Sequence, residues 1–186
     1  IPERYRKVDW KRYNNIKEIG DVDLITSVSQ EDHTSSNRFA TVISTPINYQ
    51  GPIEKGDILL VHHNVFKFYY DMYGRQKSGR SFLKDDLFLI DNDQFFLYQK
   101  NNKWFSHSKY CFIKPIPAKN SALYKGCKEE PLFGVVKYIN KELTELGVKE
   151  GDNISFTPDS EYEFYVEGEK LYRMFTNNIT MIVWYM

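Results

Sequence analysis

The chain has 186 residues, enough for one domain or for two small ones. Its 25 basic and 25 acidic side chains balance, which argues against binding of nucleic acid or of an anionic membrane through overall charge. Hydrophobic residues make up 41% and aromatic residues 16% of the chain, so we expect a packed core built mainly from strands.

Membrane, disulfide and metal classes are also disfavoured. No apolar run approaches the roughly 18 to 20 residues that cross a bilayer, and no signal-type segment opens the sequence. Cys111 and Cys127 are too few for a disulfide framework, and their spacing fits no zinc pattern. We expect a soluble cytoplasmic protein, or one of the host cytoplasm or virion if it is viral, with no metal or other cofactor.

Residues 1–21 are expected to form an N-terminal extension. Basic side chains alternate there with aromatic ones, among them Trp10 and Tyr13. Such a pattern can grip phosphate and stack on bases, or it can pack against a neighbouring subunit. The second interpretation is favoured because the segment is short, so Trp10 and Tyr13 are candidate subunit-interface residues.

A first β unit is expected over residues 22–103. Its predicted strands share alternating apolar residues and flanking turn signals and lie at 23–28, 39–45 and 57–61, and the segment 87–98 closes the unit. The polar segment 29–38 is read as a loop, and 65–83 as a hairpin whose basic tip carries Arg75, Lys77 and Arg80.

Two aromatic residues of this hairpin are candidates for a subunit interface. Alternation along 66–70 predicts that Phe66, Phe68 and Tyr70 share one face of a strand. Phe66 and Tyr70 are therefore candidate interface residues. The basic tip is interpreted as a solvated hairpin end or a guard against unwanted strand addition, with phosphate contact as the alternative.

A second β unit is expected over residues 104–186. Its predicted strands and hairpin lie at 110–116, 133–139, 153–156, 163–174 and 180–185. Residues 140–146 are predicted to hold one helical turn, and Gly168 to form the hairpin tip. Trp184, in the last predicted strand, is a further interface candidate.

The two units share a sequence motif, at 53–57 and 148–152, in which a branched apolar residue, two charged residues and a Gly-Asp turn precede a strand. Gly56 and Gly151 stand 95 positions apart, while the closing segments that begin at Leu87 and Leu171 stand 84 apart. The difference falls where the first unit has the longer hairpin. The pattern predicts an internal duplication, with two tandem, small, partly open β-barrels in an all-β chain.

No residue set predicts catalysis. Adjacent strand residues point to opposite faces, so His62 and His63 are not expected to share a metal ion. The acidic segments 85–86 and 91–93 fit turn chemistry, and no hydrolase, Walker-type or dinucleotide motif is present. We expect no catalytic residues and a protein that is not an enzyme.

The order of short motifs in the second unit matches one known family. The motifs are Lys114-Pro115, Gly134-Val135-Val136, the segment 148–152, the segment 168–174 and Asn178-Ile179. Together they resemble the GroES-type co-chaperonin family over about residues 108–184, with a weaker echo over about 22–98.

The resemblance implies a ring of partly open barrels that caps the chamber of a GroEL-type chaperonin and assists protein folding without being an enzyme. Family members grip the chaperonin through an apolar patch in the loop between their first two strands. On this sequence that loop is 118–133, and its candidate patches are Ala122-Leu123-Tyr124 and Pro131-Leu132-Phe133. Ordering such a loop costs entropy, so a ring of several copies is needed for firm binding.

A second interpretation stays open. The chain is then a structural subunit of a large assembly, such as a phage particle, that reuses this barrel and binds other structural proteins. Its richness in Lys, Asn, Ile and Tyr fits an AT-rich genome. A nucleic-acid-binding module is a more distant alternative.

Overall fold

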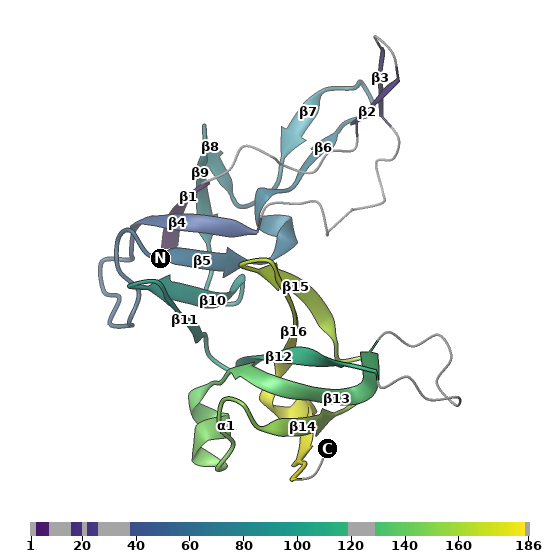
Figure 1. Cartoon of the computed structure of the whole chain (residues 1–186). Helices are drawn as coiled ribbons and strands as arrows, with labels where there is room; N and C mark the ends of the chain where they lie inside the picture. Colours follow the sequence, from purple (N-terminus) through teal and green to yellow (C-terminus); the bar gives the residue numbers. More distant parts are fainter. Residues whose placement is uncertain (1–2, 8–15, 20–21, 26–37, 119–128, 185–186) are drawn as a thin grey trace. The chain divides into compact units, whose positions relative to one another are not determined.

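The computed structural model describes residues 3–7, 16–19, 22–25, 38–118 and 129–184. The chain divides into two compact units, 1–103 and 104–186. Each unit is built on an open antiparallel sheet, and the described residues contain one short α-helix (Figure 1). The all-β class predicted from the sequence is confirmed.

The first unit holds a seven-stranded sheet in the order β11-β10-β5-β4-β1-β9-β8. Its strands are β1 (Glu3–Lys7), β4 (Phe39–Ser44), β5 (Ile58–Val61), β8 (Phe82–Lys84), β9 (Leu87–Ile90), β10 (Phe95–Lys100) and β11 (Lys103–Ser106). β11 crosses the boundary between the units. Two further sheets have two strands each, namely β2 (Ile16–Ile19) with β3 (Val22–Ile25) and β6 (Phe68–Tyr70) with β7 (Gln76–Ser78).

The second unit holds a six-stranded sheet in the order β15-β16-β12-β13-β14-β17. Its strands are β12 (Tyr110–Pro117), β13 (Glu129–Tyr138), β14 (Asn153–Phe156), β15 (Tyr162–Val166), β16 (Glu169–Phe175) and β17 (Ile179–Ile182). The helix α1 (Lys141–Glu145) lies between β13 and β14, where the sequence predicted one helical turn. The predicted Gly168 hairpin is also confirmed, because β15 and β16 pair on either side of it.

The two sheets share one strand order. Read from the edge strands β8 and β15, the order β8-β9-β1-β4-β5-β10 of the first sheet corresponds strand by strand to the order β15-β16-β12-β13-β14-β17 of the second. The first sheet has β11 as one additional strand beyond β10. All of these neighbouring pairs are antiparallel. The duplication expected from the sequence is therefore visible in the topology.

The Gly-Asp turns agree at the level of single hydrogen bonds. In the first unit Gly56 N–H donates to Val42 O at 2.9 Å, and Val42 N–H donates to Asp57 O at 2.9 Å. In the second, the same two bonds link Val136 with Gly151 at 2.8 Å and with Asp152 at 3.0 Å. Each aspartate also accepts a backbone N–H from three residues earlier at 2.8 Å. Both glycines have a positive φ, 98° and 92°, which explains why glycine stands at each turn.

The turns before the last strands agree as well. Gln94 Oε1 accepts the N–H of Asp91 at 2.9 Å, and Asn178 Oδ1 accepts the N–H of Phe175 at 3.0 Å. These contacts are 84 residues apart, the offset read from the sequence for this segment. Different amide side chains thus close the same turn in each unit.

The first strand of the first unit is β1, which differs from the sequence expectation. Residues 22–25 do form a strand, but β3 pairs with β2 in a separate hairpin rather than with β4. The place of the first strand is taken by β1, which pairs with both β4 and β9. Residues 3–7, expected in an extension outside the repeat, thus lie inside the sheet. Four of these five residues are charged, which hid this role, since a strand held by backbone bonds on both sides needs no apolar run.

Each unit has its own apolar core. In the first unit the core includes Ile53, Leu59 and Phe88, and in the second it includes Ile113, Ile154 and Met174. The predicted long hairpin at 65–83 is shorter than expected. Its first residues form the 3-10 helix η1 (His63–Phe66), and only β6 and β7 pair around the tip. A second 3-10 helix, η2 (Thr176–Asn178), precedes β17.

The helix α1 begins with a capped turn. Asn140 Oδ1 accepts the N–H of Leu143 at 2.8 Å, and the Asn140 amide donates to Thr176 Oγ1 at 2.8 Å and Tyr110 O at 3.1 Å. One buried side chain therefore ties the helix to β12 and to the 3-10 segment that begins at Thr176. No helix in the described part of the chain has both the length and the apolar character needed to span a bilayer.

Candidate partner-binding loops

The segment between the first two strands occupies the same topological place in each unit. In the second unit it connects β12, which ends at Pro117, with β13, which begins at Glu129. In the first unit it connects β1 with β4, so it covers 8–38 instead of the expected 29–38. This longer segment contains apolar residues that the polar stretch 29–38 lacks, Trp10 among them.

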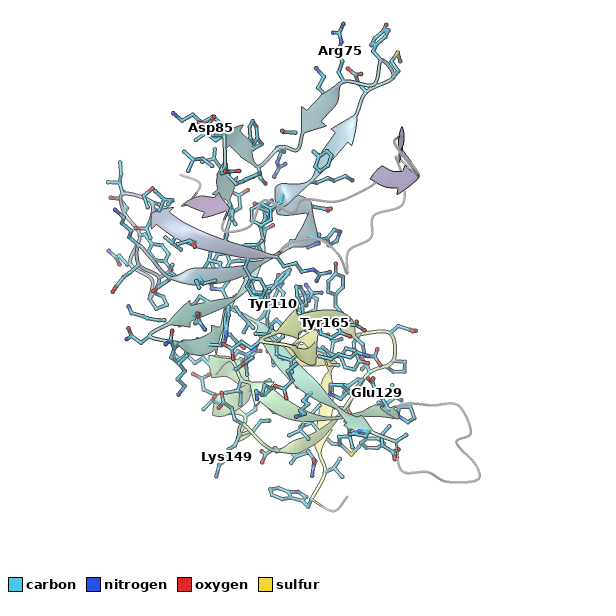
Figure 2. All side chains as sticks on the ribbon, turned by 45° about the horizontal axis from the view of Figure 1, so that its top comes forward. Arg75, Asp85, Tyr110, Glu129, Lys149 and Tyr165 are labelled. Carbon is cyan, nitrogen blue, oxygen red and sulfur yellow. The ribbon has the colours of Figure 1, made fainter. Side chains whose placement is uncertain are left out.

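A charged cluster surrounds Glu129, the residue at which the second-unit loop ends and β13 begins (Figure 2). Glu129 at the start of β13 forms an ion pair with Lys170 at 2.8 Å and accepts a hydrogen bond from the Tyr172 hydroxyl. Lys170 also lies 3.3 Å from a carboxylate oxygen of Glu163. Glu129 pairs in register with Pro117, so the two ends of the loop meet at this cluster.

The protonation of this cluster follows from its contacts. Burial alone raises the pKa of Glu129, but hydrogen bonds from Lys170 and Tyr172 outweigh it and hold the pKa of Glu129 below its ordinary value. Burial lowers the pKa of Lys170, yet hydrogen bonds to Glu129, Tyr172 and Glu163 raise it overall. Burial, followed by the bond to Glu129, raises the pKa of Tyr172. At neutral pH the cluster is an ion pair capped by a neutral phenol.

A second ion cluster lies on the same sheet. Glu169 binds Lys114 at 2.6 Å and Lys137 at 2.9 Å. Hydrogen bonds from these two lysines lower the pKa of Glu169. Strands β12, β13 and β16 are thereby tied through their side chains as well as through their backbones. These ion pairs add side-chain contacts between the strands that flank the loop.

The patch Pro131-Leu132-Phe133 lies in β13 and not in a loop. Between the pairs Pro115–Gly134 and Pro117–Glu129, four residues of β13 face a single residue of β12, which makes a wide bulge. Leu132 has a φ of 62° and packs against the core of its unit. Phe133 pairs with Ser155 of β14. Leu132 is therefore part of the core packing, and Pro131 is the exposed residue of this patch.

The patch Ala122-Leu123-Tyr124 lies outside the described residues. Pro117 and Glu129 fix where its loop leaves and re-enters the sheet. Of the two candidate patches from the sequence, this one remains in the segment between β12 and β13. It is the patch on which a loop-binding hypothesis depends.

The interface candidates have different outcomes. Phe66 is only 2% exposed and packs edge-on against Phe88 at 4.8 Å, so the structure places it in the core and removes it from any interface. The alternation argument was wrong there, because Phe66 ends a 3-10 helix instead of lying in a strand. Trp184 is 77% exposed and remains available to a partner. Tyr70 lies in β6, and Trp10 and Tyr13 fall outside the described residues.

The histidine pair differs from the expectation of opposite faces. The rings of His62 and His63 stack with centroids 4.1 Å apart, because the strand ends at Val61 and His62 caps η1. His62 Nδ1 accepts the N–H of Asn64 at 3.1 Å, so that nitrogen serves the turn. Across the described ranges, no group of three or more potential metal ligands comes together.

A shallow hollow of about 360 Å³ lies in the second unit. Its lining consists of Lys109, Glu142, Phe175, Thr176 and Asn177. The Lys109 amino group lies 5.0 Å from the centre of the Phe175 ring, a cation–π contact. Thr176 is already engaged by Asn140, so the lining offers no nucleophile held beside a base.

Sequence reasoning missed the Glu129 cluster. The cluster joins residues 41 and 43 positions apart, which become neighbours because β13 and β16 both pair with β12. Alternation of Lys170 and Tyr172 on β16 is the one signal that could have placed them on a common face. At the hairpin tip, the sequence indicated the basic residues Arg75 and Lys77, whereas Met72 was not singled out.

No protein-family model matches the chain, and no curated protein matches it.

Proposed function

We propose that the protein is a non-enzymatic co-chaperonin-like subunit that forms a ring and caps the chamber of a GroEL-type chaperonin. The observation that carries this proposal is the repeated arrangement of each unit, in which a long segment separates the first and second strands at one place of a common sheet order. A segment fixed at both ends suits reversible docking, because the rigid sheet limits the entropy lost on binding.

The sheet edges support assembly from several copies. In the first unit β10 is covered by β11, which follows it through a two-residue turn. The corresponding strand β17 ends its sheet within the described residues, with Met181 and Trp184 exposed beside it. An uncovered strand edge with exposed apolar side chains favours pairing with another chain.

The test is co-elution of the protein with a GroEL-type chaperonin in the presence of nucleotide. We expect a complex with the wild-type chain that is lost in Leu123→Ser. The matched control is Leu146→Ser, because Leu146 is an exposed leucine outside the loop. Leu132→Ser is unsuitable as a docking variant, since Leu132 packs against the core.

Failure of the wild-type chain to co-elute would reject the lid function. In that case, tight association with other proteins of a particle would favour the structural-subunit function instead. Persistence of the complex in Leu123→Ser would reject the loop patch as the gripping element.

A further inference from the structure

The tip of the β6–β7 hairpin is an ordered, hydrogen-bonded turn. Asp71 Oδ1 accepts the N–H groups of Tyr73 and Arg75, each at 2.9 Å. Two backbone bonds of 2.9 Å close the same turn, and Gly74 supplies the positive φ of 72° that the turn requires. A tip that is already ordered loses little conformational entropy when it binds.

The hairpin turn exposes side chains of types that are enriched in protein interfaces. Met72 is 88% exposed and Tyr73 is 75% exposed, and the Arg75 guanidinium lies 5.7 Å from the Tyr73 ring centre. Arg75 and Lys77 are exposed and form no ion pair with another described residue. Arg80, the third basic residue of the tip expected from the sequence, pairs instead with Asp91 at 3.7 Å, so in the structure the basic tip consists of Met72, Tyr73, Arg75 and Lys77. Aromatic, Met and Arg side chains around exposed charge favour contact with a protein of opposite sign.

A surface of opposite sign lies on the second unit. β15 is the end strand of the six-stranded sheet, with Phe164 and Val166 buried and Tyr165 53% exposed. Asp159 and Glu161, in the turn that leads into this strand, are exposed and have no ion-pair partner among the described residues. We call Asp159, Glu161 and Tyr165 the acidic edge, and Figure 2 marks it by Tyr165 and the basic tip by Arg75.

We propose that the basic tip of one copy docks on the acidic edge of a second copy of this chain. Two uncompensated positive charges then meet two uncompensated negative ones, and Met72 and Tyr73 cover Tyr165 at the open edge of β15. The chain as a whole is neutral, so complementarity between two of its own surfaces, rather than net charge, selects the partner. The contact joins unlike surfaces, so it is head-to-tail and can close into a ring.

The inference rests on the assembly of copies in the proposed function but not on chaperonin binding. Its test therefore contains no chaperonin, and failure here leaves the co-elution test to decide the lid function. The measurement is sedimentation equilibrium of the full chain over a range of protein concentrations. We expect self-association that weakens when salt rises from about 50 mM to about 500 mM.

Charge reversal on each surface identifies the contact. We expect Arg75→Glu with Lys77→Glu, and separately Asp159→Lys with Glu161→Lys, to weaken self-association about tenfold. An equal mixture of the two variants should regain wild-type association, because each then offers the surface that complements the other. Regained association also shows that both variants are folded.

The matched control is Lys55→Glu with Lys149→Glu. Both lysines are exposed at the Gly-Asp turns, and the change in net charge equals that of the tip variant. We expect the control to associate as the wild type does. A monomeric wild type, wild-type association in either reversed variant, or a mixture no stronger than its components would overturn the proposal.

Discussion

The carboxylate of Glu129 joins the end of a loop to the sheet, which makes its charge a determinant of stability. Lys170 and Tyr172 hold the pKa of Glu129 below its ordinary value of 4.5 despite partial burial. A lowered pKa in the folded state stabilises the fold above that ordinary value, and the stabilisation is lost as pH falls through the folded pKa. The contacts of Glu129 at the end of the loop should therefore contribute less to stability in acid.

We predict that Glu129→Gln lowers the free energy of unfolding at pH 7 by about 0.5 to 1 kcal/mol, a modest figure because both charges are partly solvated. The difference from the wild type should shrink as pH falls below 4.5, since the wild-type carboxylate then protonates too. Urea unfolding at several pH values measures both. Glu150→Gln, at an exposed turn, is the control. An equal loss at neutral and acid pH would contradict the ion-pair account.

Cys111 illustrates the opposite effect of burial. Its side chain is fully buried, its sulfur lies 3.7 Å from Met174 O, and desolvation raises the pKa of the thiol to about 12. Only the thiolate reacts rapidly with alkylating reagents. In a Cys127→Ser background we expect the native chain to resist iodoacetamide at pH 8 and the denatured chain to react fully. Mass spectrometry detects the label. Rapid labelling of the native chain would show that Cys111 is accessible and would contradict its burial.

At the scale of elements, the paired Gly-Asp turns make the duplication testable. Gly56 and Gly151 share a positive φ, and a Cβ added at either would touch nothing within 4 Å. The cost of Gly56→Ala or Gly151→Ala should therefore come from the backbone alone, about 1 to 2 kcal/mol in each unit. Asparagine tolerates this conformation better, so Gly→Asn at each site should cost less. Thermal unfolding measures the four variants, and markedly unequal costs at the two turns would count against equivalent conformations.

The turns and the β15–β16 hairpin were predictable from the sequence because their signals are local. Gly151-Asp152 and Gly168 mark reversals by the conformations that these residues favour. The identity of the first strand was not predictable, since β1 has no apolar run and takes its place through long-range pairing with β4 and β9. Phe66 was misplaced for a related reason, because alternation over five residues cannot distinguish a strand from a 3-10 turn.

At the candidate loop, the sequence located the segment between the first two strands of the second unit but placed its end too far along the chain. The chain re-enters the sheet at Glu129, four residues before position 133, where the loop was expected to end. The bulge around Leu132 lies between Glu129 and the regular pairing that resumes at Gly134. Tertiary partners on β16 fix that point, and such partners are not visible in a local pattern. The corresponding segment of the first unit was underestimated because its flanking strand was misassigned.

At the scale of the whole molecule, one chain supplies two related units and therefore two loops to any assembly. In the proposed function both loops dock, and their linkage in one chain raises the effective concentration of each for a multivalent target. The sheet edge at β17 and the basic tip on the first unit give each copy distinct surfaces for neighbours. Such a subunit suits a closed ring better than an isolated monomer.

Electron microscopy of the wild-type protein mixed with a GroEL-type chaperonin and nucleotide tests this account most directly. We predict a closed ring of additional density over the mouth of the chaperonin chamber, absent when the chain carries Leu123→Ser and retained with Leu146→Ser. Chaperonin particles with bare mouths beside free assemblies of the wild-type chain would contradict the account.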